Sequence, residues 1–216
     1  MEELVLKISI WGVPVLAAVV LHELAHGWVA FKLGDSTAQR AGRLTLNPVA
    51  HIDPIGTVLL PLFLIIVHSP FLFGYARPVP VNPENLRQPR RDMMLVAAAG
   101  PLMNLLLALA SALVRYALLA MHVEADSSVY GSVIEPLAMM ARSSVGMNIV
   151  LFVFNMLPIP PLDGGRVVSC LLTGRSAATF ARIEPFGMLI VMVLLASSTL
   201  NNVLDPLVSF FLRVLL

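Results

Sequence analysis

The 216-residue sequence contains few charged residues and a single cysteine. Only 12% of its residues are charged and 58% are hydrophobic, whereas a soluble domain carries about 25% charged residues. This composition argues against a soluble fold. The lone Cys170 cannot form an internal disulfide, and in an apolar stretch it is expected to be a packing residue. No basic run of the kind that binds phosphates is present, so nucleic acid is not expected as a partner.

The sequence also lacks a long polar segment that would form an appended soluble module. We therefore predict one membrane-embedded domain covering residues 1–216. The apolar residues 4–21 have neither the basic flank nor the small-residue cleavage site of a signal peptide, and they lead directly into charged residues. We expect this stretch to belong to the mature protein.

Four segments are long and apolar enough to cross a bilayer, at about residues 8–33, 93–121, 138–157 and 185–216. A further apolar segment at 55–73 contains Pro61 and Pro70, which remove backbone donors and predict a broken, re-entrant element. The residues of 43–46 alternate between polar and apolar, as in a short strand. The sequence predicts an all-α polytopic membrane protein with about four spans, one re-entrant segment and a short membrane-associated β-hairpin.

Arginine is concentrated in the loops at residues 77–91 and 166–182, and residues 32–43 are also basic. Because basic loops favour the cytoplasmic side, these three stretches are predicted to be cytoplasmic and the acidic residues 122–137 to lie outside. This arrangement requires segment 55–73 to enter and leave the membrane on the same side.

The segment His22-Glu23-Leu24-Ala25-His26 fits the pattern H-E-x-x-H. On a helix the two histidines lie one turn apart on the same face, so both imidazoles can bind one zinc ion while Glu23 reaches a water on the metal and acts as a general base. Ionisable groups inside a spanning segment are costly and are usually functional. The pattern therefore predicts a metal site within the membrane.

A catalytic zinc needs a third protein ligand. Asp163 is favoured because prolines interrupt the preceding helix and Gly164-Gly165 let the backbone approach another element. The alternative is an ordinary N-cap aspartate that follows a helix ending at the membrane surface. The full set of candidate acidic and histidine ligands in or near apolar segments is Asp35, His51, Asp53, His68, His122, Asp163 and Asp205.

The motif HELAH in the first span and NMLPIPPLDGG at residues 155–165 together resemble the site-2 protease family of intramembrane zinc metalloproteases. Both hallmarks of that family, H-E-x-x-H and N-x-x-P-x-x-x-L-D-G, match completely. The resemblance implies one zinc ion per chain bound by His22, His26 and Asp163, with Glu23 as the catalytic base. It also implies that Asn155 orients the substrate carbonyl or stabilises its oxyanion, which an amide donor can do.

Residues 42–54 are similar to the membrane-associated hairpin of this family. An exposed strand here would pair with an unwound substrate by strand addition, and the expected substrate contacts are Arg43, Leu44, Thr45 and Leu46. Asn104, in the family-like segment 100–104, is either a further substrate contact or a packing contact to another helix. The pair His51 and Asp53 fits either a partner that holds a metal ligand or a turn before a proline.

These features predict an intramembrane zinc metalloprotease that cleaves single-pass membrane proteins within the bilayer of a prokaryotic cell, with its active site towards the cytoplasm. No stretch resembles the PDZ or nucleotide-sensing domains of some family members, so a compact form is expected. Two alternatives use the same residues: a metal transporter with a His/His/Asp transit site, which would not need Glu23 as a base, and a catalytically silent membrane scaffold. The sequence carries no signal of oligomeric state.

Overall fold

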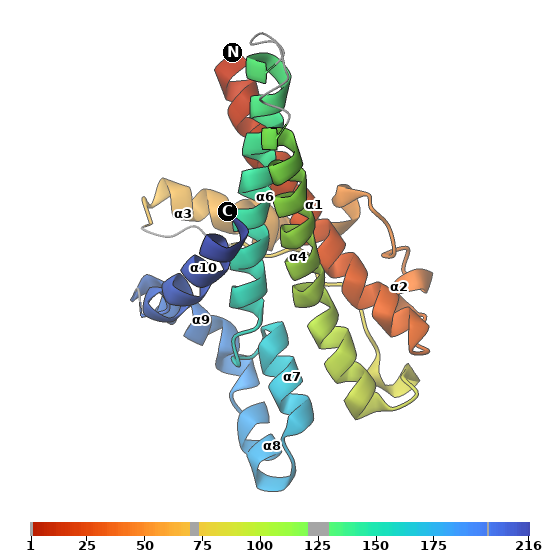
Figure 1. Ribbon diagram of the computed structural model, residues 1–216. Coiled ribbons are helices and arrows are strands. Elements are labelled where there is room, and N and C mark those ends of the chain that lie inside the picture. Colours follow the sequence, from red (N-terminus) through yellow and green to blue (C-terminus); the bar gives the residue numbers. More distant parts are fainter. Residues whose placement is uncertain (1, 70–73, 121–129, 198) are drawn as a thin grey trace.

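The protein is described by a computed structural model that covers residues 2–69, 74–120, 130–197 and 199–216. Three long helices form its framework: α1 (Glu2–Lys32), α4 (Pro89–Ala120) and α6 (Glu135–Asn155). They pack against one another along the molecule, as Figure 1 shows. The described residues are mostly helical and include no β-strand, so the predicted all-α class is confirmed.

Shorter elements surround these three helices. In chain order they are α2 (Thr37–Arg40), the 3-10 helix η1 (Pro48–His51), the π-helical turn η2 (Pro54–Leu59), α3 (Leu60–Ile66), the 3-10 helix η3 (Pro83–Asn85), the π-helical turn η5 (Tyr130–Ile134), α7 (Asp163–Leu171), α8 (Gly174–Ala181), the 3-10 helix η6 (Glu184–Phe186), α9 (Gly187–Ala196) and α10 (Asn201–Leu215). Helices α7 and α8 lie at the end of the molecule opposite the N-terminus (Figure 1).

The apolar core lies between α4, α6 and α10. Ala108, Val145 and Ile149 are completely buried there, and the small side chain at position 108 allows α4 to approach α6 closely. The apolar face of α10 covers this cluster with Leu204 and Phe211. The framework that carries the two sequence motifs is therefore a closely packed helical unit.

Four helical stretches in the described part of the chain are long and apolar enough to cross a membrane: Ser9–Lys32, Pro89–Ala120, Glu135–Asn155 and Gly174–Ala196. The first three match the predicted spans. The fourth does not, because residues 185–216 are divided between α9 and α10. Helix α9 ends at Ala196, where the Ser197 hydroxyl donates to the carbonyl of Leu194 and also bonds to Thr199. Such local bonds compete with helix continuation.

The predicted hairpin at residues 43–46 is wrong, since this stretch forms bends rather than a strand. Arg43 is buried and its Nη2 donates to the carbonyl of Arg77 (2.6 Å). The Asn47 amide donates to the Thr45 hydroxyl (3.1 Å), and the His51 ring nitrogen Nε2 donates to the Thr45 carbonyl (3.0 Å). These local side-chain bonds replace the ladder that a hairpin requires.

The apolar segment that follows begins at Asp53, whose side chain accepts hydrogen bonds from the amides of Ile55 and Gly56 (3.0 and 2.7 Å). The turn interpretation of this aspartate is thus confirmed. Beyond α3 and residues 70–73, which lie outside the described residues, the chain returns to its starting point. The Tyr75 amide donates to the Gly56 carbonyl (3.0 Å), and the Thr57 hydroxyl donates to the Tyr75 carbonyl (2.9 Å).

Candidate metal centre

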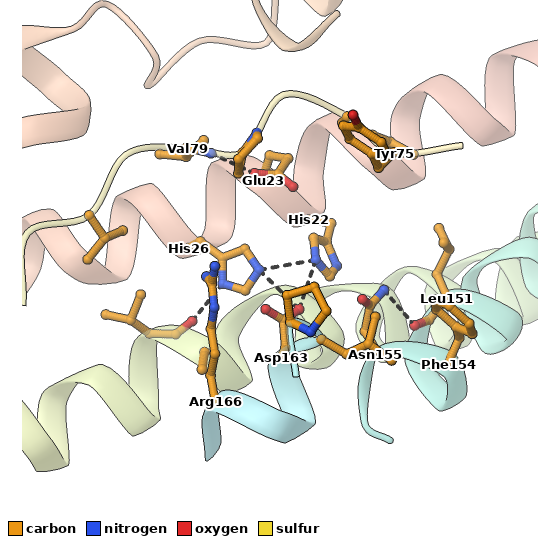
Figure 2. Close-up of a pocket in the computed structure, with 18 of the residues that line it drawn as sticks. His22, Glu23, His26, Tyr75, Val79, Leu151, Phe154, Asn155, Asp163 and Arg166 are labelled. Carbon is orange, nitrogen blue, oxygen red and sulfur yellow. Dashed lines mark hydrogen bonds and ion pairs between the residues drawn. The ribbon is translucent and has the colours of Figure 1, made fainter. Parts of the chain in front are cut away.

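The two motif histidines lie one turn apart on α1, and Nδ1 of each ring already has a hydrogen-bond partner. His26 Nδ1 lies 2.7 Å from the carbonyl of Val96, and His22 Nδ1 lies 2.6 Å from Oδ1 of Asn104. A carbonyl oxygen only accepts, so His26 carries its proton on Nδ1. In the neutral ring, Nε2 then carries the electron pair that can bind a metal, and it faces the cavity (Figure 2).

Asp163 reaches the same point from the first turn of α7. The chain folds back tightly here, because a Cβ on Gly164 would lie 2.3 Å from the carbonyl oxygen of Met156 and one on Gly165 would lie 2.5 Å from the Pro160 nitrogen. Only glycine fits such close backbone contacts. The predicted role of the two glycines is consistent with this geometry, which brings Asp163 inward.

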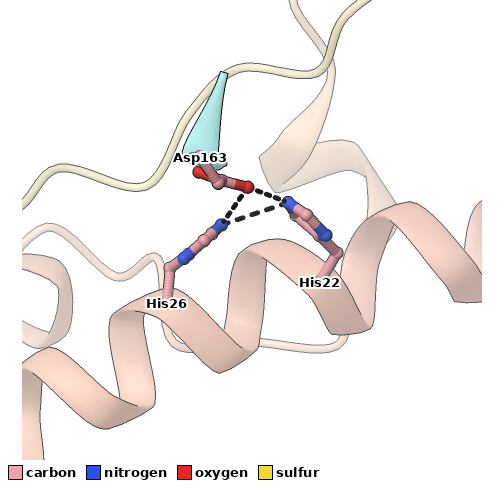
Figure 3. Close-up of side chains that lie close together, drawn as sticks. All are labelled: His22, His26 and Asp163. Atoms are coloured by element: carbon pink, nitrogen blue, oxygen red, sulfur yellow. Dashed lines mark hydrogen bonds and ion pairs between the residues drawn. The ribbon is translucent and has the colours of Figure 1, made fainter. Parts of the chain in front are cut away.

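Three ligand atoms converge at this point (Figure 3). Asp163 Oδ2 lies 3.2 Å from His22 Nε2 and 3.3 Å from His26 Nε2, and the two nitrogens are 3.1 Å apart. Tetrahedral zinc with bonds of about 2.0–2.1 Å spaces its ligand atoms about 3.3 Å apart. Electron pairs directed at one another in a buried site repel unless a proton or a metal cation lies between them. The residues therefore fit a zinc ion.

Helix α4 passes the imidazoles at Gly100, which the sequence analysis did not identify as part of the site. A Cβ built on Gly100 would lie 2.3 Å from His26 Nε2 and 2.6 Å from His22 Nε2. A side chain at this position would thus occupy the space beside both ligand nitrogens. The only sequence signal for Gly100 was its location in the family-like segment 100–104. That segment alone does not predict that its helix packs against the two histidines.

Glu23 is bound by an extended segment, residues 74–82, that we call the strap. The backbone amide of Val79 donates to Glu23 Oε2 (2.9 Å), as Figure 2 shows. The strap is fixed on either side of this contact: the Arg77 amide donates to the His51 carbonyl (2.9 Å) and the Asn82 amide to Asp35 (2.7 Å). Nothing in the sequence predicted that this loop crosses the site.

A cavity of about 470 Å³ lies between the strap, α1 and α7 and is lined by His22, Glu23, His26 and Asp163. Asn155 and Arg166 line it as well. The Asn155 side chain donates one N–H to the Leu151 carbonyl (3.0 Å), which leaves its second N–H for another partner. The cavity is large enough for a short stretch of extended peptide beside the ligand group.

Two sets of predicted substrate contacts do not line this cavity. Asn104 is completely buried and lies behind His22, where it makes a contact between helices. Of the predicted strand residues, Arg43 is buried under the strap and Leu46 is 65% exposed. Leu44 and Thr45 are likewise not among the lining residues.

The other candidates for the third ligand do not join the group in the described residues. Asp35 and Asp53 hold loop backbone, and His51 is buried against the Thr45 carbonyl. His68 and Asp205 are exposed, and His122 lies outside the described residues. His22, His26 and Asp163 remain the one three-ligand group found there.

Asp35 connects the strap to the end of α1. It is completely buried and accepts from the Thr37 amide and hydroxyl (3.0 and 2.5 Å), the Asn82 amide (2.7 Å) and Asn85 Nδ2 (2.9 Å). Burial raises the pKa of its carboxyl group, but the bonds from Asn85, Thr37 and Asn82 outweigh this, and the pKa is lowered. The contribution of Asp35 to stability is therefore present above its unfolded pKa of about 3.9 and is lost as the pH falls through the lower folded pKa.

Replacing Asp35 with asparagine should destabilise the protein by about 1.5–3 kcal/mol, the value of a hydrogen bond to a charged group. The NH₂ group of asparagine would face N–H groups that donate to Asp35 in the native protein, so these hydrogen bonds would be lost. Thermal unfolding in detergent at neutral pH measures the effect, and Glu84→Gln in the same loop, where the side chain is exposed, is the control. Equal unfolding temperatures for Asp35→Asn and the control would contradict this role.

Arg90, in the first turn of α4, holds the other end of α7. Its Nε donates to the Cys170 carbonyl (2.5 Å) and its Nη2 donates to the Leu172 carbonyl. A cation at the C-terminus of a helix is favourable because the last carbonyls have no partner in the helix. This contact joins the basic stretch 77–91 to the basic stretch 166–182, which forms most of α7 and α8, and it fixes the end of the helix that carries Asp163.

Comparison with known proteins identifies the family. The chain is 38% identical over 207 residues to a Bacillus subtilis protein named "Putative zinc metalloprotease YwhC", and the match covers 91% of this chain and 84% of that protein. The chain belongs to peptidase family M50. The sequence model of that family matches residues 117–198, which include Asp163 and its motif. The resemblance to the site-2 proteases is thus confirmed.

Two further relatives are less similar. Rip2 of Mycolicibacterium smegmatis, which has the same zinc metalloprotease description, is 30% identical over 196 residues, with 91% of this chain and 70% of Rip2 covered. Rip2 of Mycobacterium tuberculosis H37Rv is 29% identical over 187 residues, with coverages of 87% and 66%. No solved structure matches the chain.

Proposed function

We propose that this M50 chain is an intramembrane zinc metalloprotease that hydrolyses peptide bonds in or near the spanning segment of a single-pass membrane protein. The observation that carries the proposal is the convergence of His22, His26 and Asp163 beside Glu23 in a buried cavity of a helical membrane fold. The names of the YwhC and Rip2 relatives describe zinc metalloproteases, which supports zinc as the metal.

When bound, zinc lowers the pKa of a coordinated water and polarises the carbonyl of the scissile peptide bond. His22, His26 and Asp163 would hold the ion and leave a position open for these groups. Glu23, fixed through Oε2 by the Val79 amide, takes the proton from the attacking water and passes it to the leaving amine. The free N–H of Asn155 is available to the oxyanion.

We place the chain in a prokaryotic cell membrane as one domain, with the metal site towards the cytoplasm. Arg90 joins the basic stretches 77–91 and 166–182. The Arg87 amide donates to the Leu33 carbonyl (3.2 Å), which brings the third basic stretch, residues 32–43, to the same end. Three adjacent basic stretches support a cytoplasmic position. The contacts of Tyr75 with Gly56 and Thr57 support a re-entrant course for the segment between them.

The site is less consistent with a metal transporter. A transit site would use the two histidines and the aspartate but would have no use for Glu23, which the strap holds beside them. The position of this carboxylate favours hydrolysis over transport.

Metal removal tests the proposed function. The detergent-purified protein, incubated with a peptide that contains a membrane-spanning segment, should cleave it with zinc present and lose all measurable activity after chelation. Adding zinc back should restore cleavage, whereas magnesium should not, because this N/O ligand set favours zinc. Cleavage that continues in protein shown by elemental analysis to be metal-free would refute the mechanism.

A further inference from the structure

We propose that Asn148, on α6, is a positioning residue of the metal centre that acts through Asn104. The two side-chain amides form a buried chain of hydrogen bonds, the amide relay, that keeps the proton of His22 on Nδ1 and its electron pair on Nε2. The inference rests on the proposed function only in taking zinc as the metal. It assigns a role to a residue that belongs to neither family motif.

The relay is well defined by its contacts. Asn104 is 0% exposed and Asn148 is 1% exposed. Oδ1 of Asn104 lies 2.6 Å from His22 Nδ1, and its Nδ2 donates to Oδ1 of Asn148 (2.9 Å) and to the carbonyl of Ala18 (3.2 Å). Nδ2 of Asn148 donates to the carbonyl of Ser144 (2.9 Å). The relay thereby connects α1, α4 and α6.

Two backbone carbonyls determine the direction of every bond in this chain. The Ser144 carbonyl can only accept, so the NH₂ group of Asn148 must face it and the oxygen of Asn148 must face Asn104. The NH₂ group of Asn104 then faces Asn148 and Ala18, and its oxygen faces His22. An oxygen accepts, so the proton of His22 lies on Nδ1 and the unprotonated Nε2 is left for the metal.

The interior of the helix bundle makes this direction costly to reverse. Turning Asn148 would place its NH₂ group opposite that of Asn104 and its oxygen opposite the Ser144 carbonyl. Turning Asn104 would place its oxygen opposite the oxygens of Asn148 and Ala18, again at a site without solvent. Asn148 accepts the second N–H of Asn104, which would otherwise be buried without a partner. Without Asn148, the orientation of Asn104 depends on the longer bond to Ala18 alone.

A purely structural role for Asn148 must be separated from positioning. Polar contacts between spanning helices also stabilise packing, and α4 and α6 share such a contact nearby in the hydrogen bond between Ser111 and Ser144 (2.8 Å). The Ser144 hydroxyl also accepts from Nδ2 of Asn148 (3.2 Å). Removal of the Ser111 hydroxyl takes away a bond between these two helices but leaves both Ser144 acceptors of Asn148 in place. Ser111→Ala is therefore the matched control for Asn148→Leu.

The test measures zinc affinity by competition with a chelating dye at fixed pH, and unfolding of the metal-free protein. Loss of an outer partner of a metal-binding histidine weakens metal binding by about 10- to 100-fold. We expect this loss for Asn148→Leu and a change below about twofold for Ser111→Ala. Because Asn148 acts through Asn104, the double variant Asn104→Leu/Asn148→Leu should bind zinc as weakly as Asn104→Leu alone.

Wild-type affinity in Asn148→Leu, or equal weakening in Asn148→Leu and Ser111→Ala, would overturn the proposal. So would additive losses in the double variant. If leucine prevents folding, Asn148→Ala serves in the same comparison. Failure of the proposed function would look different, since the wild-type protein itself would then bind no zinc or cleave no peptide.

Discussion

Replacing Glu23 with glutamine should lower peptide hydrolysis by about 10²- to 10⁴-fold, the usual contribution of a general base, while the protein still binds one zinc ion. Glutamine keeps the length of the side chain, but its amide cannot take a proton from the attacking water. Its oxygen can still accept from the Val79 amide, which donates to Glu23 Oε2 in the native protein. The position of the side chain is thus preserved and only the proton transfer is lost.

Cleavage of a spanning peptide and zinc content by elemental analysis, both measured on the same purified samples, check this expectation. Glu84→Gln makes the same chemical change at an exposed loop position and should leave both unchanged. Full activity in Glu23→Gln with one bound zinc would show that another group acts as the base. Zinc uptake into vesicles that continues in an inactive Glu23→Gln protein would favour the transporter.

The convergence of the three proposed metal ligands was predictable because each belongs to a short motif with a geometric meaning. A spacing of four residues on a helix places His22 and His26 on one face. The prolines before Asp163 and the glycines after it indicate a helix that stops and turns back, and the structure shows that turn beside the histidines. Local sequence indicated the turn but left Asp163 open to an N-cap reading, and only the resemblance to the site-2 proteases implied that it joins His22 and His26.

The parts that could not be predicted depend on contacts between distant segments. Alternation at residues 43–46 predicted a strand, but Arg43 is instead held by the Arg77 carbonyl, 34 positions away. The contact of Val79 with Glu23 spans 56 positions and uses a backbone amide, which every residue except proline possesses. A contact made by a backbone amide therefore cannot be predicted from the type of residue that makes it.

Asn104 illustrates an intermediate case. An asparagine in an apolar helix predicts a contact inside the bundle, and the alternative of helix packing agrees with its buried position. The identity of its partners, His22 and Asn148, depends on how α1, α4 and α6 are rotated about their axes. That rotation is determined by the packing of whole helix faces, which no single motif encodes.

Replacing Gly100 with alanine should abolish zinc binding and, with it, peptide hydrolysis. The new methyl group would lie 2.3 and 2.6 Å from the two Nε2 atoms, well inside van der Waals contact of about 3.5 Å. We expect zinc affinity to fall more than about 100-fold, beyond the loss of an outer hydrogen-bond partner. Gly146→Ala on α6 is the matched control. A Cβ there meets nothing within 4 Å and alanine is compatible with a helix, so this variant should bind zinc normally. Wild-type zinc affinity in Gly100→Ala would show that the ion does not occupy the space beside these nitrogens.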